Sequence, residues 1–345
     1  MSRIAVVTSS PPMVEGGHLV IARELVRALR DAGHDAEIIV TPQNRFGRQA
    51  SAYVATWLTD VGTSDGRRID QVISLRFPSY AVRHERHVCW LNHTMREYYD
   101  LWDRFSSTLN RRALLKERIR RRAMHVADRY LLTRNVTRLF VQSRTIQQRL
   151  AMWPELKSTV LYPPAPQRPY RCEAYGDYFF MVSRLTPLKR ADLLIEALGT
   201  PDGAGIRALI AGDGEDRPRL ESLISRLALG DRVSLLGRID DDQMLEHYAR
   251  CRAVVFPPVQ EDYGFVTVEA FASRKPVVTC RDSGGPAELV IDGVNGSICE
   301  PTAAGLALAL RQLIDDPERT EQLGAAAFEY GVKLNWPETI RHLTS

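Results

Sequence analysis

Short apolar runs, each followed by a polar loop and a helical repeat of apolar residues, recur along the chain and constrain its fold most strongly. Such a run has the length and composition of a buried strand. Strands that alternate with helices are typical of parallel sheets built from β-loop-α-β units. The sequence therefore predicts an α/β protein, with strands at residues 4–8, 36–40, 69–75, 87–91, 139–141, 178–182, 208–211, 253–256 and 276–280.

Length favours two domains, because 345 residues exceed what one hydrophobic core usually serves. Helical and strand periodicity breaks down between Tyr162 and Tyr170, where four of nine residues are proline. Such a segment forms a stiff, extended connector. We therefore predict an N-terminal domain of residues 1–165, a C-terminal domain of residues 171–328 and a terminal helix within residues 329–345.

The composition and the first residues argue against a membrane-spanning or secreted protein. No apolar run reaches the roughly 18 residues of a spanning helix. The chain passes from Met1-Ser2-Arg3 directly into its first strand, without the apolar core of a signal peptide. Its five cysteines lack C-x-x-C spacing, which favours free thiols over zinc ligands or disulfides. We therefore expect a cytoplasmic protein.

Two glutamates stand eight residues apart around the loop that follows strand 253–256. Ligands of open α/β sheets bind at this carboxyl edge. Taken alone, Glu261 is better explained as a solvated loop acid, since charged residues are usually exposed. Glu269 lies beside Ala270 and Phe271 on the helix predicted for residues 265–273. A plain surface position explains it less well, because these neighbours are apolar. The pair is a candidate ligand-binding site.

Two strand-to-helix turns are candidates for binding an anion. Arg184 and Lys189 flank the turn after strand 178–182, where positive charge combines with a helix N-terminus. Gly16 and Gly17 precede the helix predicted for residues 18–30, and fit either a phosphate close to the backbone or a plain tight turn. The G-x-G-x-x-G pattern of dinucleotide sites is absent.

The region around Glu261 and Glu269 and the turn with Arg184 and Lys189 both resemble parts of one known family. The string E-D-Y-G-F-V-T-V-E-A, residues 261–270, resembles the E-x7-E signature of retaining glycosyltransferases of family 4. The string from Ser183 to Ala197 resembles that family's diphosphate-binding turn, and S-G-G-P-A-E at 283–288 matches its G-G-x-x-E. The resemblance covers essentially the whole chain, but it is specific only from about Ser183 to Glu288.

The resemblance implies a GT-B fold, in which two Rossmann-like domains with parallel sheets face each other across a cleft. The donor nucleotide would lie on the C-terminal domain and the acceptor chiefly on the N-terminal one. In similar enzymes the terminal helix returns to the N-terminal domain. No cofactor is implied, because the nucleotide diphosphate sugar is a substrate.

The resemblance also assigns residue roles. Glu261 would contact the donor sugar's hydroxyls, and Glu269 the ribose hydroxyls; a carboxylate can accept from two neighbouring hydroxyls at once. Arg184 and Lys189 would neutralise the leaving diphosphate. His93 opens a stretch similar to one in bacterial family 4 enzymes, whose histidine lies beside the transferred sugar, so we count it with Arg184, Lys189 and Glu261 as catalytic. The other implied donor-binding residues are Gly16, Gly17, Gly212, Gly237, Arg238, Ile239, Asp262, Tyr263, Gly264, Phe265 and Val266.

An acidic triplet, Asp240-Asp241-Asp242, could be taken for a D-x-D metal motif. It immediately precedes the helix predicted for residues 243–250, where acidic residues are expected as N-caps. We therefore predict a helix cap there and a reaction that uses no metal.

The segment from Arg104 to Arg149 is the most basic part of the chain. It carries twelve arginines and lysines between Arg111 and Arg149 against only Glu117 and Asp128. Three interpretations stay open: a solvated helical face, a surface for an anionic membrane or a phosphate-bearing acceptor, and a nucleic-acid site. No known nucleic-acid module is present, so no nucleic acid is expected. The second interpretation would place the protein peripherally at the inner membrane face.

Together these features predict a retaining hexosyltransferase. Its donor would be GDP-mannose or a UDP-sugar, and its acceptor a hydroxyl of a glycan, a lipid-linked sugar or a small molecule. Two other classes of function stay open. One is a GT-B sugar-nucleotide epimerase or hydrolase, and the other is a non-catalytic basic interaction protein on the same scaffold.

Overall fold

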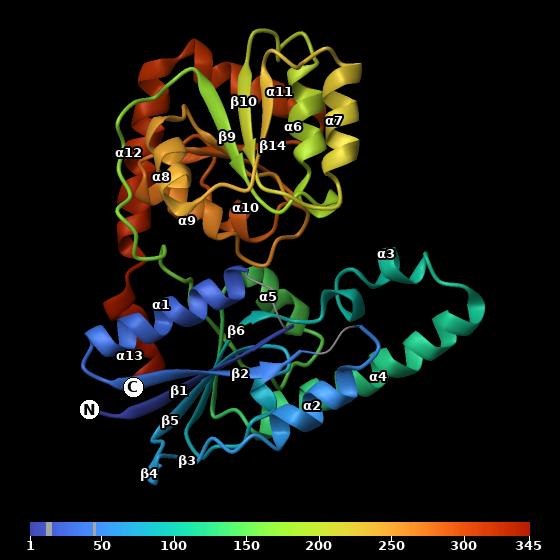
Figure 1. The fold of residues 1–345 in the computed structure, drawn as a ribbon, viewed down its shortest axis with the longest axis vertical. Coiled ribbons are helices and arrows are strands. Elements are labelled where there is room, and N and C mark those ends of the chain that lie inside the picture. The colour runs from blue at the N-terminus through green and yellow to red at the C-terminus, as the bar shows by residue number, and fades with distance from the viewer. Residues whose placement is uncertain (12–15, 44–45) are drawn as a thin grey trace. The chain divides into compact units, whose positions relative to one another are not determined.

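The computed structural model describes residues 1–11, 16–43 and 46–345 and consists of two compact units. Unit 1 contains Met1–Pro166 and Trp336–Ser345, and unit 2 contains Gln167–Asn335 (Figure 1). The terminal helix α13 (Trp336–Thr344) is therefore part of unit 1, whereas residues 329–333 complete the preceding helix, α12, in unit 2. Each unit carries one six-stranded sheet.

Unit 1 contains a parallel sheet with the order β2-β1-β5-β6-β7-β8. Strand β1, the second strand of this sheet, pairs with β2 on one side and with β5 on the other. The strands are β1 (Arg3–Ser10), β2 (Asp35–Pro42), β5 (Gln71–Arg76), β6 (His87–His93), β7 (Arg138–Val141) and β8 (Thr159–Val160). A small antiparallel pair, β3 (Thr63–Ser64) and β4 (Arg67–Arg68), lies outside this sheet.

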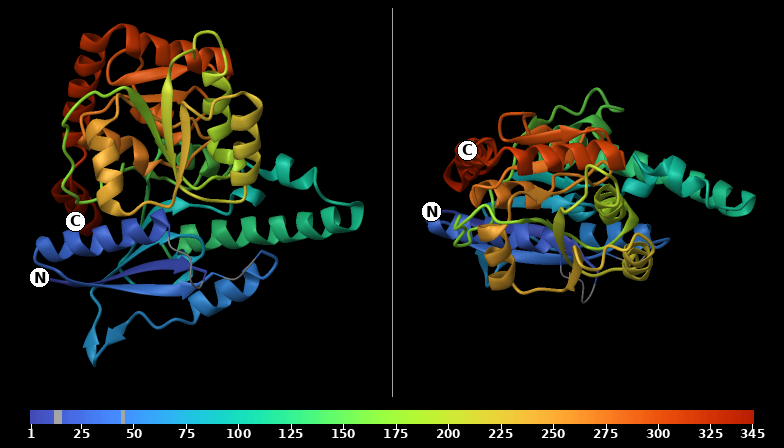
Figure 2. Two further views of the ribbon diagram at one scale, coloured as in Figure 1. Left: turned by 45° about the horizontal axis from the view of Figure 1, so that its top comes forward. Right: turned by 90° about the horizontal axis from the view of Figure 1, so that it is seen from above.

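Helices cover both faces of the unit 1 sheet (Figures 1 and 2). Trp90 of β6 meets Trp336 of α13 edge to face on one side, while Leu91 of β6 packs with Met124 and Ile146 on the other. The helices are α1 (Gly17–Asp31), α2 (Gln49–Trp57), α3 (Trp102–Ser106), α4 (Arg111–Arg134) and α5 (Arg144–Leu150), with short 3₁₀ turns η1 (Ser79–Ala81) and η2 (Arg96–Tyr98). The basic segment of the sequence thus folds mainly as α4.

Unit 2 contains a parallel sheet with the order β11-β10-β9-β12-β13-β14. In chain order this is 3-2-1-4-5-6, the order of a Rossmann fold. The strands are β9 (Tyr178–Val182), β10 (Arg207–Ala211), β11 (Val233–Gly237), β12 (Val254–Val255), β13 (Val277–Cys280) and β14 (Gly296–Cys299). Residues 293–295 form the turn that precedes β14, which runs parallel to β13.

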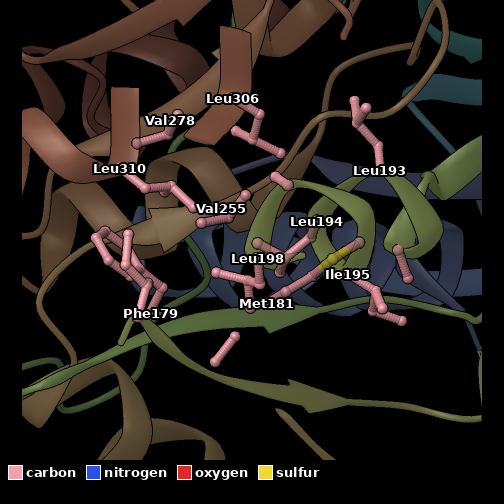
Figure 3. Close-up of a cluster of buried hydrophobic side chains, with 14 of the residues drawn as sticks. Phe179, Met181, Leu193, Leu194, Ile195, Leu198, Val255, Val278, Leu306 and Leu310 are labelled. Carbon is pink, nitrogen blue, oxygen red and sulfur yellow. The ribbon is translucent and has the colours of Figure 1, made fainter. Parts of the chain in front are cut away.

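The packing of unit 2 explains why its strands are continuous apolar runs in the sequence. Both faces are covered by helices, so successive side chains such as Phe179, Phe180 and Met181 are all buried. Figure 3 shows Met181 and Val255 gathered with side chains of the covering helices. The helices are α6 (Ala191–Leu198), α7 (Arg217–Arg226), α8 (Asp241–Arg250), α9 (Phe265–Ala272), α10 (Gly285–Leu289), α11 (Ala303–Asp315) and α12 (Pro317–Lys333), with η3 (Pro187–Lys189) before α6.

Candidate active site

An ion pair stands at the point where the strand order of unit 2 reverses. The chain leaves β9 toward β10 on one side, and β12 lies next to β9 on the other. In a sheet of this kind, ligands bind outside the carboxyl ends of the two central strands. Lys189, in the turn after β9, donates from Nζ to Oε2 of Glu261, in the loop after β12, at 2.6 Å. Both side chains are about one-fifth exposed, so solvent and small molecules can reach the pair.

Arg190 ties together the loops that carry this pair. Its guanidinium forms a two-pronged ion pair with Asp282 after β13, with N–O distances of 2.6 and 3.0 Å. It also donates to the backbone carbonyls of Pro257 and Pro258 after β12, at 2.5 and 2.7 Å. Three loops from three strands therefore share one planar group, which fixes the position of neighbouring Lys189.

Two glycines allow the loop of Glu261 to lie directly against the start of α10. Glu261 forms an isolated parallel bridge with Gly284, and its carbonyl accepts from the backbone N–H of Gly285 at 2.9 Å. A Cβ on Gly285 would meet the Cα of Tyr263 at 2.5 Å, and one on Gly284 would meet the carbonyl oxygen of Glu261 at 2.6 Å. Any larger residue at these positions would displace the Glu261 loop.

Glu269 is buried on α9 and surrounded by hydrogen-bond donors. Its Oε2 accepts from the Tyr248 hydroxyl at 2.9 Å, and its Oε1 from the Tyr170 hydroxyl at 3.3 Å. Nη1 of Arg168 lies 3.3 Å from Oε1. Burial raises the pKa of the Glu269 carboxyl, and Arg168 with the two phenols opposes only part of this rise. Ionised, this carboxylate is a strong acceptor for hydroxyls of a bound ligand.

The other basic and glycine residues predicted for the donor lie around β9, β10 and β11. Arg184 is exposed in the turn after β9, and among the described residues its side chain has no ion pair. Gly212, after β10, has φ +125° and packs against the Ser183 carbonyl, which leaves no room for a Cβ. Its N–H donates to the carbonyl of Gly237 at 2.7 Å. Arg238 is largely exposed and Ile239 is half-buried.

The residues between the two glutamates form the turn that begins α9. Gly264 caps the helix with φ +84°, a conformation that favours glycine. Tyr263 is buried and meets the half-buried Phe265 edge to face. Asp262 and Val266 are half-buried as well. This turn fixes the direction in which Glu261 and Glu269 leave the backbone.

Three predicted site residues belong to unit 1. Gly16 precedes α1, and Gly17 is its first residue; the preceding residues 12–15 of the glycine-containing loop lie outside the described residues. Both glycines stand after β1, next to β5, which is where the strand order of this sheet reverses. His93 is the last residue of β6 and is half-buried.

The acidic triplet caps a helix, as expected. The Asp240 carboxylate accepts from the backbone N–H of Gln243 at 2.8 Å, and the Gln243 side chain accepts in turn from the N–H of Asp240 at 3.1 Å. This is a capping box at the start of α8. Asp241 lies 3.3 Å from Arg168. Within residues 1–11, 16–43 and 46–345, no cluster of three or more His, Cys, Asp or Glu side chains is arranged to hold a metal ion.

A known family matches most of unit 2, which contains the Lys189–Glu261 ion pair. The sequence model of Glycosyl transferases group 1 matches residues 174–330. This segment belongs to the glycosyl transferases group 1 family. The group 1 domain therefore begins just before β9 and ends within α12, and it includes Arg184, Lys189, Glu261 and Glu269.

Curated relatives match part of the chain. The uncharacterized glycosyltransferase MJ1178 of Methanocaldococcus jannaschii is 32% identical over 168 residues, which are 48% of this chain and 46% of the relative. The alpha-D-kanosaminyltransferase of Streptomyces kanamyceticus is 34% identical over 149 residues, 42% of this chain and 38% of the relative. The chain thus spans less than half the length of these curated relatives.

Solved structures match the whole chain in fold. HepE of Anabaena, in complex with UDP and glucose, has a TM-score of 0.72 at 20% identity and covers 98% of both chains. The two six-stranded parallel sheets and this match establish that the group 1 domain is one half of a GT-B fold. Within the described residues, every helix is too short or too polar to cross a bilayer.

Several residues around the predicted site were not found from the sequence. Arg168 and Tyr170 lie in the proline-rich segment, which was interpreted only as a connector, yet both contact Glu269. Tyr248 lies on α8, twenty-one residues before its partner. Arg190 was part of the string resembling the diphosphate turn, but its partner Asp282 carries no local signal. The contacts of Glu269 and the Arg190–Asp282 ion pair depend on which strands are neighbours in the sheet, and local sequence patterns do not predict that order.

Proposed function

We propose that this chain is a retaining glycosyltransferase that moves a hexosyl group from a nucleoside diphosphate sugar to an acceptor hydroxyl. One observation carries the proposal: in a group 1 domain, Lys189 and Glu261 meet at 2.6 Å where the strand order reverses. A cation and a carboxylate side by side suit a ligand that joins an anionic diphosphate to a polyhydroxylated sugar.

Each side chain has a distinct role in the proposed reaction. Lys189 and Arg184 neutralise the diphosphate as the bond between the sugar's anomeric carbon and the phosphate oxygen breaks. Glu261 accepts from hydroxyls of the sugar, and Glu269 from those of the ribose. The acceptor oxygen bonds to the anomeric carbon on the same face, and its proton passes to the departing phosphate oxygen. His93, in unit 1, stays a predicted catalytic residue on the strength of the resemblance.

The remaining donor-binding residues shape the nucleotide site. Gly212 and Gly237 keep the edge above β10 and β11 free of side chains, so backbone groups can approach the ligand. Arg238 and Ile239 border the base, and residues 262–266 border the sugar. Gly16 and Gly17, in unit 1, stay predicted donor-binding residues on the strength of the resemblance. In this scheme two cations provide the charge stabilisation that a metal ion provides in other transferases.

Relatives guide the choice of donor to test. HepE is complexed with UDP and glucose, and one curated relative is a kanosaminyltransferase, so its name too describes transfer of a sugar. The E-D-Y-G-F stretch resembles the E-D-F-G-I of bacterial mannosyltransferases, and this resemblance favours GDP-mannose. UDP-sugars and GDP-mannose therefore form the first donor panel, and glycan, lipid-linked and small-molecule hydroxyls form the acceptor panel.

The deciding experiment measures transfer directly. Purified protein is first screened with each nucleotide sugar by thermal shift, and the stabilising donors are then incubated with the acceptor panel. We expect release of nucleoside diphosphate together with a product one hexose heavier than the acceptor. Lys189→Ala should lower nucleotide release and product formation by about 100-fold or more. Lys333→Ala, at an exposed position of α12, should change neither.

The same assay separates the two alternative functions. An epimerase or hydrolase would convert the donor without any acceptor, yielding an epimer or free sugar. A non-catalytic interaction protein would bind nucleotide but give no product with the whole panel. Either result would contradict transferase activity. Peripheral contact with an anionic membrane is a separate proposal, supported by the exposed surface of α4.

A further inference from the structure

Helix α4 carries an exposed apolar stripe on the side opposite its buried residues. Successive residues of an α-helix are about 100° apart, so Leu115, Ile119, Val126 and Tyr130 fall within an arc of about 60°. These four side chains are 63%, 64%, 68% and 62% exposed. The buried residues of α4 lie on the opposite side: Glu117, Met124, Asp128, Leu131 and Leu132. The outer stripe therefore contributes nothing to the core of unit 1.

The inner face of α4 is firmly anchored. The buried Asp128 carboxylate accepts hydrogen bonds from three tyrosine hydroxyls, those of Tyr53, Tyr80 and Tyr99. Tyr53 lies on α2, Tyr80 in η1 and Tyr99 just after η2, so one side chain connects α4 to three other segments. Because this network holds the helix, side chains of the outer stripe can be changed without unfolding it.

The accessible charge of α4 is entirely positive. The helix has nine arginines and lysines, and its only acids, Glu117 and Asp128, are both buried. The cations on its exposed side stand on both flanks of the outer stripe. Those that form no ion pair with any described residue are Arg111, Arg112, Lys116, Arg118, Arg122 and Arg134. Unpaired cations of this density attract an anionic surface.

Helix α2 extends the apolar surface beside α4. Val54, Trp57 and Leu58, on α2 and at its C-cap, are 55%, 43% and 65% exposed. Between the two helices lies an apolar hollow of about 480 Å³, lined by Tyr53, Val54 and Trp57 on one side and by Ala127, Tyr130 and Leu131 on the other. In both figures α4 extends beyond the sheet of unit 1 (Figures 1 and 2).

We propose that the outer face of α4, together with Val54, Trp57 and Leu58, docks onto an anionic lipid bilayer. A stripe of aliphatic side chains with arginines on both flanks is the pattern of a helix that lies in the membrane interface. Trp57 and Tyr130 are amphipathic aromatics of the kind enriched at that depth. A second copy of this face would oppose like charges, and a nucleic acid would leave the aliphatic stripe uncovered.

This inference does not depend on the proposed transferase activity, and its test requires no donor. The whole protein is sedimented with vesicles of phosphatidylcholine alone or with 30–40% phosphatidylglycerol, about the proportion that gives a strongly anionic surface. We expect binding to the anionic vesicles only, with affinity that falls steeply as salt rises from low to physiological concentration. Equal binding to neutral vesicles, or binding to neither, would overturn the proposal.

Two substitutions locate the contact. Val126→Glu and Ile119→Glu place a carboxylate in the outer stripe and should each weaken vesicle binding about tenfold or more. Leu308→Glu makes the same charge change at a half-exposed position of α11 in unit 2 and should leave binding unchanged. Circular dichroism melting of all three variants confirms that the fold is retained. Equal losses in all three would contradict a contact through α4.

Tryptophan fluorescence tests how the surface sits in the bilayer. Brominated acyl chains quench only tryptophans that enter the apolar region, and Trp57 is an exposed tryptophan on the proposed surface. Anionic vesicles with brominated lipid should quench the wild type, and Trp57→Phe should remove most of this quenching. Quenching that persists in Trp57→Phe would contradict the proposed orientation. Loss of a dimer in Val126→Glu, without vesicle binding by the wild type, would assign the face to a second copy instead.

Discussion

Lys189 and Glu261 stand 72 residues apart in the chain, yet the ammonium of one donates to the carboxylate of the other at 2.6 Å. They meet because β12 returns to the side of β9 that β10 leaves open. In the proposed reaction each has a partner on the donor, so the diphosphate must compete with Glu261 for Lys189. The ion pair holds the cation in place until a donor arrives.

Removing either proposed diphosphate cation should slow transfer while leaving the fold intact. Lys189→Ala and Arg184→Ala should each lower kcat by about 100-fold or more, since charge on the leaving group is stabilised in the transition state. Steady-state kinetics with the preferred donor checks this, and Lys333→Ala serves as the control. Wild-type turnover in both variants would contradict the proposed clamp.

Replacing Glu269 by glutamine should raise stability and weaken nucleotide binding. Burial raises the pKa of Glu269 in the folded protein, so the folded state holds its proton more tightly than the unfolded state. The stability of the wild type therefore falls as pH rises above the carboxyl's unfolded value, and Glu269→Gln escapes this loss. We expect the variant to melt higher at pH 7, with a difference that shrinks near pH 4.5, the ordinary value for this carboxyl.

Calorimetry measures the functional side of this prediction. Nucleoside diphosphate should bind Glu269→Gln about tenfold more weakly, because an amide accepts ribose hydroxyls less strongly than a carboxylate. Glu329→Gln, an exposed glutamate of α12, is the matched control for both measurements. Unchanged affinity in Glu269→Gln would remove its ribose assignment, whatever its melting temperature.

Arg190 should act by positioning Lys189. Arg190→Lys keeps the positive charge but cannot reproduce the two-pronged pair with Asp282 and the bonds to two proline carbonyls. We expect turnover to fall about tenfold. In a double-mutant cycle the same change should have little further effect when Lys189 is already alanine, because the two residues act through one contact. Fully additive effects would show that Arg190 does not act through Lys189.

Gly285→Ala should disturb the Glu261 loop. The added Cβ would lie 2.5 Å from the Tyr263 backbone, so the loop must shift, at a cost of about 1–3 kcal/mol in the free energy of unfolding. Donor affinity should fall with it. Gly230→Ala adds the same methyl group where no atom lies within 4 Å, and should leave stability within about 1 kcal/mol. Equal melting temperatures for the two variants would contradict this packing.

Local pattern was sufficient for most elements of unit 2. The sequence predicts a strand at residues 178–182, and β9 has these bounds. The cap at Asp240 was also correct. These features depend on neighbours within a few residues, through side-chain periodicity and capping chemistry. Residues 49–57 and 63–68 form α2 and the small β3–β4 pair, although their sequence shows no such periodicity.

By itself, the sequence determined the alternation of strands and helices, and the placement of charged residues at strand ends. Only the tertiary structure decided which ends are neighbours, and hence that Lys189 meets Glu261 and that Tyr170 and Tyr248 enclose Glu269. It also decided that the acids of α4 turn inward and its aliphatic stripe outward. The physical reason is the sequence separation over which each effect acts. Periodicity and capping act within one or two helical turns, whereas strand order and core packing bring together residues that are far apart in the sequence.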